Sequence, residues 1–468
     1  MQSRRDQVQA QSYVLGRLTS ALVGADPDGL ENPNRRMVTG TISGVLIAAL
    51  MFGGFAVFGF VVPGGASTWR QPGVVVVEKE TGSRYIYVGG LLRPVLNYSS
   101  ARLLFGKAPK MVTVSGKSLR GVAHGQPVGI VGAPDALPTG NTVGGQVWTV
   151  CAIAVRDRSG AQSVGTSLAI DLADTAARHD TPLSPDQAVV VTDGDDTFLV
   201  WRGRRLRLAE TWLARVLGYE DAPVTVGTNW LESVPVGPDI APPAVPGRGT
   251  AGPDIDGRRT TIGELFTAQT AGTPERRYLL MKDGLAELSP VAYAIVAADP
   301  ATAEAYHGRP VAPHELSPAA LVQLPVSRRP ALPDGLPDIP PRPAPTPAGG
   351  SWCVRQSMAD GGVEVTADTR GPAATAVQDG AGLTRTDRTA AAVTVQPGVG
   401  GLVLAGRMDQ AAGSGFYLVT DAGIKYPLGS AAVAGVLGFP STRAHPVPRE
   451  LLEMLPTGPL LDTASATE

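Results

Sequence analysis

A partial phosphate-binding pattern is the first feature of this sequence that could support chemistry. Gly116, Lys117 and Ser118 match the last three positions of a P-loop, whose backbone N–H groups and lysine hold nucleotide phosphates. Met111 stands where that motif requires its first glycine, and the strand-like residues 111–114 leave no glycine-rich turn. We therefore interpret the pattern as a strand end followed by a helix cap, and we predict no cofactor site.

Three further motifs of catalytic or nucleotide-binding sites are not fulfilled. Residues 247–252 fit G-x-G-x-x-G, but the proline-rich residues 242–246 stand where a dinucleotide site needs a strand. His314 and Glu315 do not continue into the zinc-binding H-E-x-x-H helix, and the serine motif G-x-S-x-G is absent from the sequence. We predict no catalytic residue.

A short acidic cluster could bind a cation. It consists of Asp193, Asp195 and Asp196. A solvated hairpin turn explains the same residues, since aspartate is favoured in turns. The turn is the preferred interpretation, and we predict no metal site.

The two cysteines, Cys151 and Cys353, offer redox chemistry. Neither has a second cysteine or a histidine at metal-ligand spacing. In an oxidising compartment they could form one internal disulfide, which the chain-entropy model values on the order of 5 kcal/mol for so long a loop. A pair of free, buried cysteines is the alternative. The compartment therefore decides between a disulfide and free cysteines, and it depends on whether a membrane segment places this part of the chain outside the cytoplasm.

An uncharged segment sets that compartment. No charged residue stands between Arg36 and Arg70, and residues 38–62 are almost continuously apolar. About 25 residues in a helix rising about 1.5 Å each can cross a hydrocarbon core of about 30 Å. We expect one transmembrane helix, because no second run of this length occurs.

The charges beside the segment predict its orientation. The arginines that precede it are Arg4, Arg5, Arg17, Arg35 and Arg36. Only Arg70 and Lys79 follow it closely, so the positive-inside rule predicts a cytoplasmic N-terminus and an extracytoplasmic body at the inner (plasma) membrane. A cleaved signal peptide is the alternative, but the basic region and the apolar core are too long and no A-x-A site follows.

The N-terminal head predicts an amphipathic helix. Its expected partner-contact residues are Tyr13, Leu15, Leu18 and Leu22. Such an apolar stripe lies on the membrane surface or docks on a partner, because water alone would leave it unburied. Gly40 and Gly44 form a G-x-x-x-G pattern that favours close helix packing inside the membrane.

The remaining chain predicts a repeated structure. The formal net charge of −2 gives no basic surface for nucleic acid, while 57 glycines and 41 prolines suit short strands and turns. Four segments share an aromatic-led strand, an apolar run and a short helix that ends at proline. These strands begin at Tyr85, Phe198, Tyr278 and Tyr417.

Two strand-like inserts interrupt the repeats. Residues 146–153 and 351–354 each contain one cysteine with a tryptophan nearby, and we infer that they meet in one central β domain closed by Cys151 and Cys353. The predicted fold is α+β, with a single N-terminal transmembrane helix and an elongated extracytoplasmic body of four α/β repeats around a central β domain. The predicted parts are a cytoplasmic amphipathic head (1–37), the transmembrane helix (38–62), repeat 1 (63–139), central domain part a (140–190), repeat 2 (191–245), repeat 3 (246–329), a Pro-rich linker (330–349), central domain part b (350–405) and repeat 4 (406–468).

At this point the chain resembles a known family. Residues 3–23 (SRRDQVQAQSYVLGRLTSALV), residues 25–28 (ADPD), Arg35 and Arg36 before one span, and residues 69–73 (WRQPG) are similar to EccB. EccB is a membrane core component of the actinobacterial type VII (ESX) secretion machine. The resemblance covers essentially the whole chain. It implies assembly with the subunits EccC, EccD and EccE.

The sequence leaves three hypotheses for the function of this chain. The leading one is a non-catalytic scaffold that braces a secretion channel on its extracytoplasmic side, with self-association through the body. The second is extracytoplasmic ATP hydrolysis, because some members of this family are labelled ATPases. No Walker motif is present here, so enzymatic activity is left undecided and its absence is favoured. The third is binding of peptidoglycan by aromatic residues of the repeats.

Overall fold

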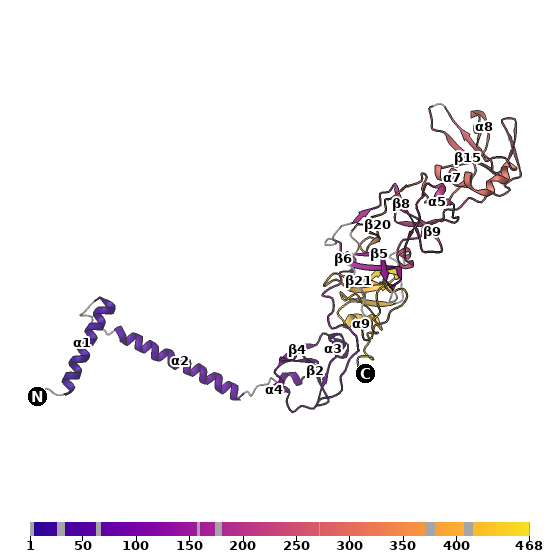
Figure 1. Cartoon of the computed structure of the whole chain (residues 1–468). Helices are drawn as coiled ribbons and strands as arrows, with labels where there is room; N and C mark the ends of the chain where they lie inside the picture. Colours follow the sequence, from indigo (N-terminus) through magenta and orange to yellow (C-terminus); the bar gives the residue numbers. More distant parts are fainter. Residues whose placement is uncertain are drawn as a thin grey trace. The chain divides into compact units, whose positions relative to one another are not determined.

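The structure, a computed structural model, describes residues 4–25, 33–61, 67–156, 160–173, 180–270, 272–369, 380–406 and 415–467. Its contacts divide the chain into two compact units. The first unit comprises Met1–Pro94 and Lys110–Gln126, and the second comprises Val95–Pro109 and Pro127–Glu468. Figure 1 traces the elements along the chain.

Two helices open the first unit. Helix α1 runs over Arg4–Gly24 and α2 over Pro33–Val61. Proline is favourable at the first position of α2, where its missing N–H would have no helical partner. Within α2, Met37–Val57 is long and apolar enough to cross a membrane, with a mean hydropathy of 1.9. The predicted span ends at Val62, which lies outside the described residues.

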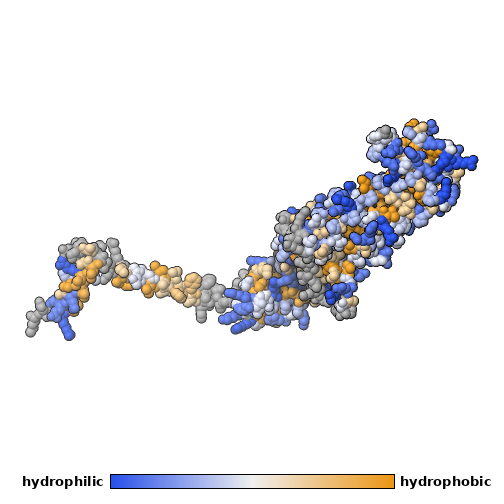
Figure 2. Space-filling view, turned by 45° about the horizontal axis from the view of Figure 1, so that its top comes forward, coloured by the Kyte–Doolittle hydropathy of each residue, from blue (hydrophilic) through white to orange (hydrophobic). Residues whose placement is uncertain are grey.

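The side chains of α2 explain why it suits lipid. Phe52 and Phe55 are 80% and 76% exposed, and the apolar colouring follows the helix in Figure 2. A helix that is apolar all round is stable only when its surroundings are apolar. It is the one helix in the described part of the chain that meets the length and hydropathy of a span.

Four sheets share one topology. In each, the first three strands form an antiparallel meander, and a fourth strand returns parallel to the first. The first strands are β1 (Val74–Glu78), β8 (Gln187–Thr192), β14 (Leu265–Ala268) and β22 (Gly401–Ala405). The second strands are β2 (Arg84–Val88), β9 (Thr197–Trp201), β15 (Arg276–Met281) and β23 (Phe416–Val419). The third strands are β3 (Leu91–Pro94), β10 (Arg204–Arg207), β16 (Gly284–Leu288) and β24 (Lys425–Pro427). The fourth strands are β4 (Lys110–Val114), β11 (Val224–Thr225), β17 (His314–Glu315) and β25 (His445–Val447).

Two helices complete each repeat. One lies between the third and fourth strands, since a parallel return needs a crossover connection. These helices are α3 (Tyr98–Phe105), α5 (Leu213–Val216), α7 (Pro290–Ala298) and α9 (Ala431–Val436). The other follows the fourth strand. These helices are α4 (Gly116–Leu119), α6 (Thr228–Glu232), α8 (Pro318–Gln323) and α10 (Arg449–Glu453).

In three of the repeats, the glycine that follows the first helix is explained by its backbone conformation. Gly106, Gly218 and Gly438 follow α3, α5 and α9 with φ of 68°, 89° and 94°, a left-handed conformation that glycine adopts without steric cost. Repeat 3 has Asp299 at the end of α7, with φ −64°. Its carboxylate instead accepts the N–H of Ala301 and begins a 3₁₀ helix over Pro300–Tyr306. The sequence difference therefore marks a different helix ending.

A six-stranded sheet joins distant parts of the second unit. Its strand order is β21-β6-β5-β19-β20-β7. The strands are β5 (Gln146–Arg156), β6 (Gln162–Leu172), β7 (Asp180–Pro182), β19 (Ser351–Ser357), β20 (Val363–Asp368) and β21 (Ala392–Val395). The two predicted inserts thus lie side by side, because β5 pairs with β19.

Hydrophobic cores connect the repeats of the second unit to this sheet. One core packs the central strands against repeat 2 through Val191 and Trp230, and against repeat 4 through Val403 and Leu451. Another packs Val291 of α7 into the core of repeat 2. Repeats 2 and 4 therefore flank the central sheet, and repeat 3 attaches through repeat 2. Helix α3 belongs to this unit as well, since Arg102 Nε donates to Val436 O of α9 at 3.0 Å.

The first unit has its own core. Trp69, Val76 and Leu92 are buried together under the first sheet. Trp69 meets the Tyr87 ring edge-on with centroids 5.3 Å apart. The first sheet therefore holds together through residues within its own unit.

Two features differ from the expected boundaries. Strands β8 and β22 begin at Gln187 and Gly401, so the strands of repeats 2 and 4 start before residues 191 and 406. The predicted Pro-rich linker packs against repeat 2, where β18 (Arg342–Pro343) pairs with β8. Arg342 N–H donates to Asp186 O, and Ala344 N–H to Ala188 O, at 2.8 and 2.9 Å. Prolines alternate with residues that keep their N–H, so the segment can still pair with a sheet edge.

Candidate functional site

The two cysteines form a disulfide in the middle of the central sheet. Cys151 of β5 stands directly opposite Cys353 of β19, and both are almost fully buried. The bond spans a sequence separation of 202 residues. It therefore closes a loop that contains all of repeats 2 and 3.

Tryptophans beside the disulfide are held by hydrogen bonds. Trp230 Nε1 of α6 donates to Trp352 O of β19 at 2.8 Å, and Trp148 Nε1 donates to Gln146 Oε1 at 3.0 Å. Both donors lie in the core, where a polar group without a partner is costly. The bond from Trp230 fixes repeat 2 to the central sheet, and the bond from Trp148 lies within β5.

A buried ion pair fixes the opposite edge of this sheet. Arg355 Nη1 of β19 lies 3.3 Å from Asp180 Oδ2 of β7, and each side chain is only 9% exposed. Burial raises the pKa of nearby Asp171, and the charge of Arg355 opposes that rise. A buried pair of this kind favours one arrangement of strands, because each charge needs its partner.

Repeat 4 carries a buried amine. Lys425 Nζ donates to Leu452 O at 2.6 Å, and burial lowers the pKa of Lys425 to about 8. His445 Nε2 lies 2.6 Å from Met358 O and links β25 to the end of β19. The first contact joins β24 to α10 within repeat 4, and the second fixes repeat 4 to the central sheet.

The partial P-loop is already filled by carboxylates. Gly116 N–H donates to Glu80 Oε2 at 2.8 Å, and this bond lowers the pKa of Glu80. A Cβ on Gly116 would lie 2.5 Å from Glu78 Oε1. Ser115 is the N-cap residue of α4, and its hydroxyl lies 3.2 Å from that of Ser118 instead of accepting a backbone N–H. A phosphate here would meet two carboxylates in place of free N–H groups.

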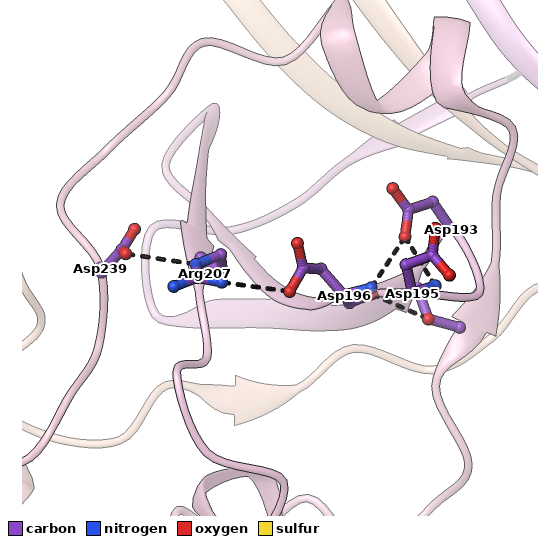
Figure 3. Close-up of polar contacts among 6 residues, drawn as sticks. Asp193, Asp195, Asp196, Arg207 and Asp239 are labelled. Carbon is purple, nitrogen blue, oxygen red and sulfur yellow. Dashed lines mark hydrogen bonds and ion pairs between the residues drawn. The ribbon is translucent and has the colours of Figure 1, made fainter.

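The acidic cluster forms the β8–β9 hairpin turn (Figure 3). Asp193 Oδ1 accepts the N–H groups of Asp195 and Asp196 at 3.1 and 3.0 Å. Arg207 then bridges Asp196 and Asp239, at 3.2 Å to each. Two of the three carboxylates in the turn are thus engaged within the protein. Across the described ranges, no group of three or more metal-ligating side chains occurs.

The other chemical patterns belong to repeat 3. Residues 247–252 form a turn that runs into β12 (Ala251–Ile255), and a hairpin follows in place of a helix. His314 of β17 stacks on Tyr306 and meets Phe266 at a tilt, with ring centroids 6.0 and 5.9 Å away. Burial lowers the pKa of His314, so the ring is neutral in the core.

The aromatic residues at the start of the predicted repeat strands pack in or against the hydrophobic cores. Tyr278 is buried, and Tyr85, Phe198 and Tyr417 pack against the cores of their repeats. Their faces are therefore largely covered by apolar neighbours. This packing gives little support to a sugar-binding platform built from them.

The predicted contact residues of the head and span are exposed. The exposed fractions of Tyr13, Leu15, Leu18 and Leu22 in α1 range from 52% to 81%. A Cβ added to Gly40 or Gly44 in α2 would meet nothing within 4 Å among the described atoms. Arg35 and Arg36 lie in the first turn of α2, next to its apolar stretch. These surfaces are open to a partner or to lipid.

Together these features define a class: a protein with one apolar helix joined to a body of four sheet repeats and a disulfide-closed central sheet. The chain belongs to the EccB family of type VII secretion systems. The family model described as "Type VII secretion system ESX-1, transport TM domain B" matches residues 1–468. The predicted family is confirmed.

Relatives with curated names agree. The chain is 28% identical to "ESX-3 secretion system ATPase EccB3" of Mycolicibacterium smegmatis over 99% of this chain and 90% of that protein. It is 27% identical to "ESX-1 secretion system ATPase EccB1" of Mycobacterium tuberculosis over 98% and 93%. The match to "ESX-3 secretion system ATPase EccB3" of Mycobacterium tuberculosis is 32% identical over 62% of this chain, and spans 56% of that protein.

Solved structures share the fold. A chain from an intact ESX-5 inner membrane complex has a TM-score of 0.68 and 24% identity, over 100% of this chain and 95% of that one. The EccB3 dimer from the ESX-3 core complex has a TM-score of 0.65 and 25% identity, over 84% of this chain and 99% of that one. The predicted fold class, one apolar helix with a sheet-rich α+β body, is confirmed.

Several structural residues escaped sequence reasoning. The Arg355–Asp180 pair and the buried Lys425 have no local signature, because a charged residue in a short strand reads as exposed. Their partners lie far away in the chain or on another element. One weak signal was present: Lys425 stands between the apolar residues Ile424 and Tyr426 in a strand of repeat 4.

Proposed function

We propose that this chain is a structural membrane subunit of a type VII secretion complex and braces its channel on the extracytoplasmic side. The observation that carries this proposal is the family match over all 468 residues, together with the one span and the four-repeat body. The second unit, tied by a buried disulfide and a shared core, is suited to bear load, since repeats 2 and 4 cannot leave the central sheet without exposing apolar surface.

The orientation is part of the proposal. The N-terminal arginines favour a cytoplasmic head, and the Cys151–Cys353 disulfide suits an oxidising compartment for the body. Protease added to intact spheroplasts should then remove a C-terminal tag and spare an N-terminal tag. The reverse pattern would overturn the orientation.

Partners follow from the related complexes. The ESX-3 structure is of an EccB3 dimer, and the ESX-5 structure is of an inner membrane complex. We propose self-association through the body and assembly with EccC, EccD and EccE. We propose that the body of this subunit consists of four repeats and a central sheet, with repeat 2 starting at β8 and repeat 4 at β22.

Purification from native membranes tests the assembly. Tagged full-length chain, solubilised in detergent from cells with an intact secretion locus, should bring down the other membrane subunits. Recovery as a lone monomer would overturn the proposal.

A substitution in helix α1 tests directly whether the head contacts the partner subunits. Leu18→Glu puts a charge on the apolar stripe of α1 and should reduce recovery of the partner subunits. Gln9→Glu is the matched control for the leucine side of α1, because nine residues at about 100° each place Gln9 opposite Leu18. Equal loss in both variants would show that the stripe is not the contact.

A further inference from the structure

A groove opens beside the β9–β10 hairpin of repeat 2. It has a volume of about 750 Å³. One side is formed by Trp201, Arg202 and Arg204, and the other by residues 335–342 of the Pro-rich segment. The groove therefore combines an aromatic ring, arginines and an extended wall.

The hairpin beside the groove departs from its usual turn chemistry. Trp201 pairs with Arg204, so Arg202 and Gly203 form a two-residue loop. Their φ values are 47° and 68°, as a type I′ turn requires. Asn, Asp or Gly are preferred at the first position, because a larger side chain is strained at positive φ.

Two other two-residue hairpin loops with positive φ follow the rule. The β2–β3 loop is Gly89-Gly90, and the loop between β12 and β13 (Arg258–Thr261) begins with Asp256. Arginine at position 202 is therefore an exception within the same protein. Backbone strain of this kind tends to persist where the side chain has a use.

The side chain of Arg202 is held in a defined place. Its guanidinium carbon lies 4.5 Å from the Trp201 ring centroid. Pro185 O accepts Trp201 Nε1 at 2.9 Å and lies 3.4 Å from Arg202 Nε. An arginine stacked on an aromatic ring keeps its outer N–H groups directed outward, ready for a carboxylate.

The wall opposite is fixed from behind. Tyr219 Oη donates to Pro341 O at 2.8 Å, and Val291 N–H donates to Asp338 O at 3.0 Å. Ile339, between them, is 69% exposed. The wall is thus a rigid, extended surface with one apolar side chain available for contact.

The charges of the groove are unequal. Asp186 already binds Arg342, with 3.0 Å between Asp186 Oδ2 and Arg342 Nε, and this bond lowers the pKa of Asp186. Arg202 and Arg204 are exposed and pair with no carboxylate among the described residues. Only Asp338 on the far wall offsets them. The groove is therefore complementary to a negative ligand.

We propose that this groove binds an acidic, extended peptide segment of a partner protein. Charge complementarity supplies the acidic character, and the proline, isoleucine and tryptophan lining supplies the contact that extended peptides use. Arg202 and Arg204 bind the carboxylates. This inference rests on the proposed assembly function and names one contact for it.

Arg202→Asn gives a test that separates binding from folding. Asn-Gly is a preferred type I′ pair, so the variant should melt no lower than the wild-type protein. A fluorescein-labelled peptide of alternating Glu and Gly should bind full-length protein in detergent, and its affinity should fall about ten-fold or more in Arg202→Asn and in Arg204→Gln. The fall should shrink at high salt. Arg259→Gln, at an exposed arginine on β13, is the matched control and should bind normally.

Several outcomes would overturn the proposal. Equal peptide affinity in Arg202→Asn, or equal loss in Arg259→Gln, would show nonspecific charge attraction. Competition by inorganic phosphate at peptide concentrations would indicate a small-anion site. Binding of the carboxylated polysaccharide alginate without binding of the peptide would favour a glycan ligand.

The experiments distinguish failure of the groove proposal from failure of the proposed assembly function. If the wild-type chain recovers its partner subunits but binds no acidic peptide, the groove proposal fails and the assembly role stands. If the peptide binds and the partners are absent, the assembly role fails alone.

Discussion

The indole N–H of Trp230 donates to the backbone carbonyl of Trp352, 2.8 Å away and 122 positions later in the chain. This bond joins the last helix of repeat 2 to the strand that carries Cys353. Both tryptophans are buried in the same core. The junction between repeat 2 and the central sheet therefore includes a directional contact inside an apolar interface, beside the bond from Asn229 Nδ2 to Arg388 O at 2.8 Å.

Removing that donor should weaken the junction. Trp230→Phe leaves the Trp352 carbonyl without its indole partner and opens a small cavity, so we expect a loss of about 2 kcal/mol or more in the free energy of unfolding. Thermal unfolding of the purified protein measures it. Trp212→Phe, at a half-buried tryptophan of the same repeat, is the control. A similar melting temperature in both variants would contradict the prediction.

The disulfide should contribute stability because it closes a long loop. Replacing Cys151 and Cys353 together by serine should lower the free energy of unfolding by about 2–5 kcal/mol. Denaturant unfolding with and without reductant checks this, and the reduced wild-type protein should resemble the double variant. Two reactive thiols in the unreduced, denatured wild-type protein would show that the pair is not formed.

The buried Lys425 predicts a dependence on pH. Its pKa is about 8 when folded, and the ordinary value is 10.5, so between these values the unfolded chain binds more protons. Stability should therefore rise with pH across this window, by an amount on the order of 3 kcal/mol at most. Burial raises the pKa of the neighbouring Tyr426 to about 12, so the trend should reverse above about pH 10.

A variant isolates the lysine. Lys425→Met removes the titrating group and should flatten the rise in melting temperature between pH 8 and pH 10. Lys79→Met, at an exposed lysine, serves as the comparison. An unchanged slope in Lys425→Met would assign the pH effect to another residue.

ATP hydrolysis gives a separate prediction. The relatives' names include ATPase, but Glu80 occupies the N–H that a phosphate would need. Lys117→Ala should therefore leave any phosphate release by the purified protein unchanged. A drop in the rate for Lys117→Ala, with Lys107→Ala unaffected, would restore the P-loop interpretation.

The sequence predicted the repeats from their second strands, which carry the aromatic marks at Tyr85, Phe198, Tyr278 and Tyr417. The starts of the first strands were harder to predict. Strands such as β8 (QAVVVT) have an apolar centre without an aromatic residue or an alternating pattern. This explains the displaced starts of repeats 2 and 4. The Pro-rich segment was read as a spacer from composition, although Arg342 and Ala344 retain the N–H groups that pair with the sheet.

Some candidate sites could be predicted from the sequence and others could not. The cysteine pair could be anticipated, since two cysteines allow only one internal bond. The groove could not, because Pro185, Arg202 and Ile339 come from three separate stretches and meet only in the folded repeat. The strain at Arg202 was visible only once the register of the hairpin was known.

The strand order of the central sheet has a consequence for biosynthesis. Strands β5 and β6 are made early, but β19, which covers the open side of β5, follows only after repeats 2 and 3. Until then β5 is an unpaired edge that displays the thiol of Cys151. Unpaired edges invite association with other chains. A nascent chain that stalls within repeat 3 would therefore be the form most exposed to cross-linking and in greatest need of a chaperone.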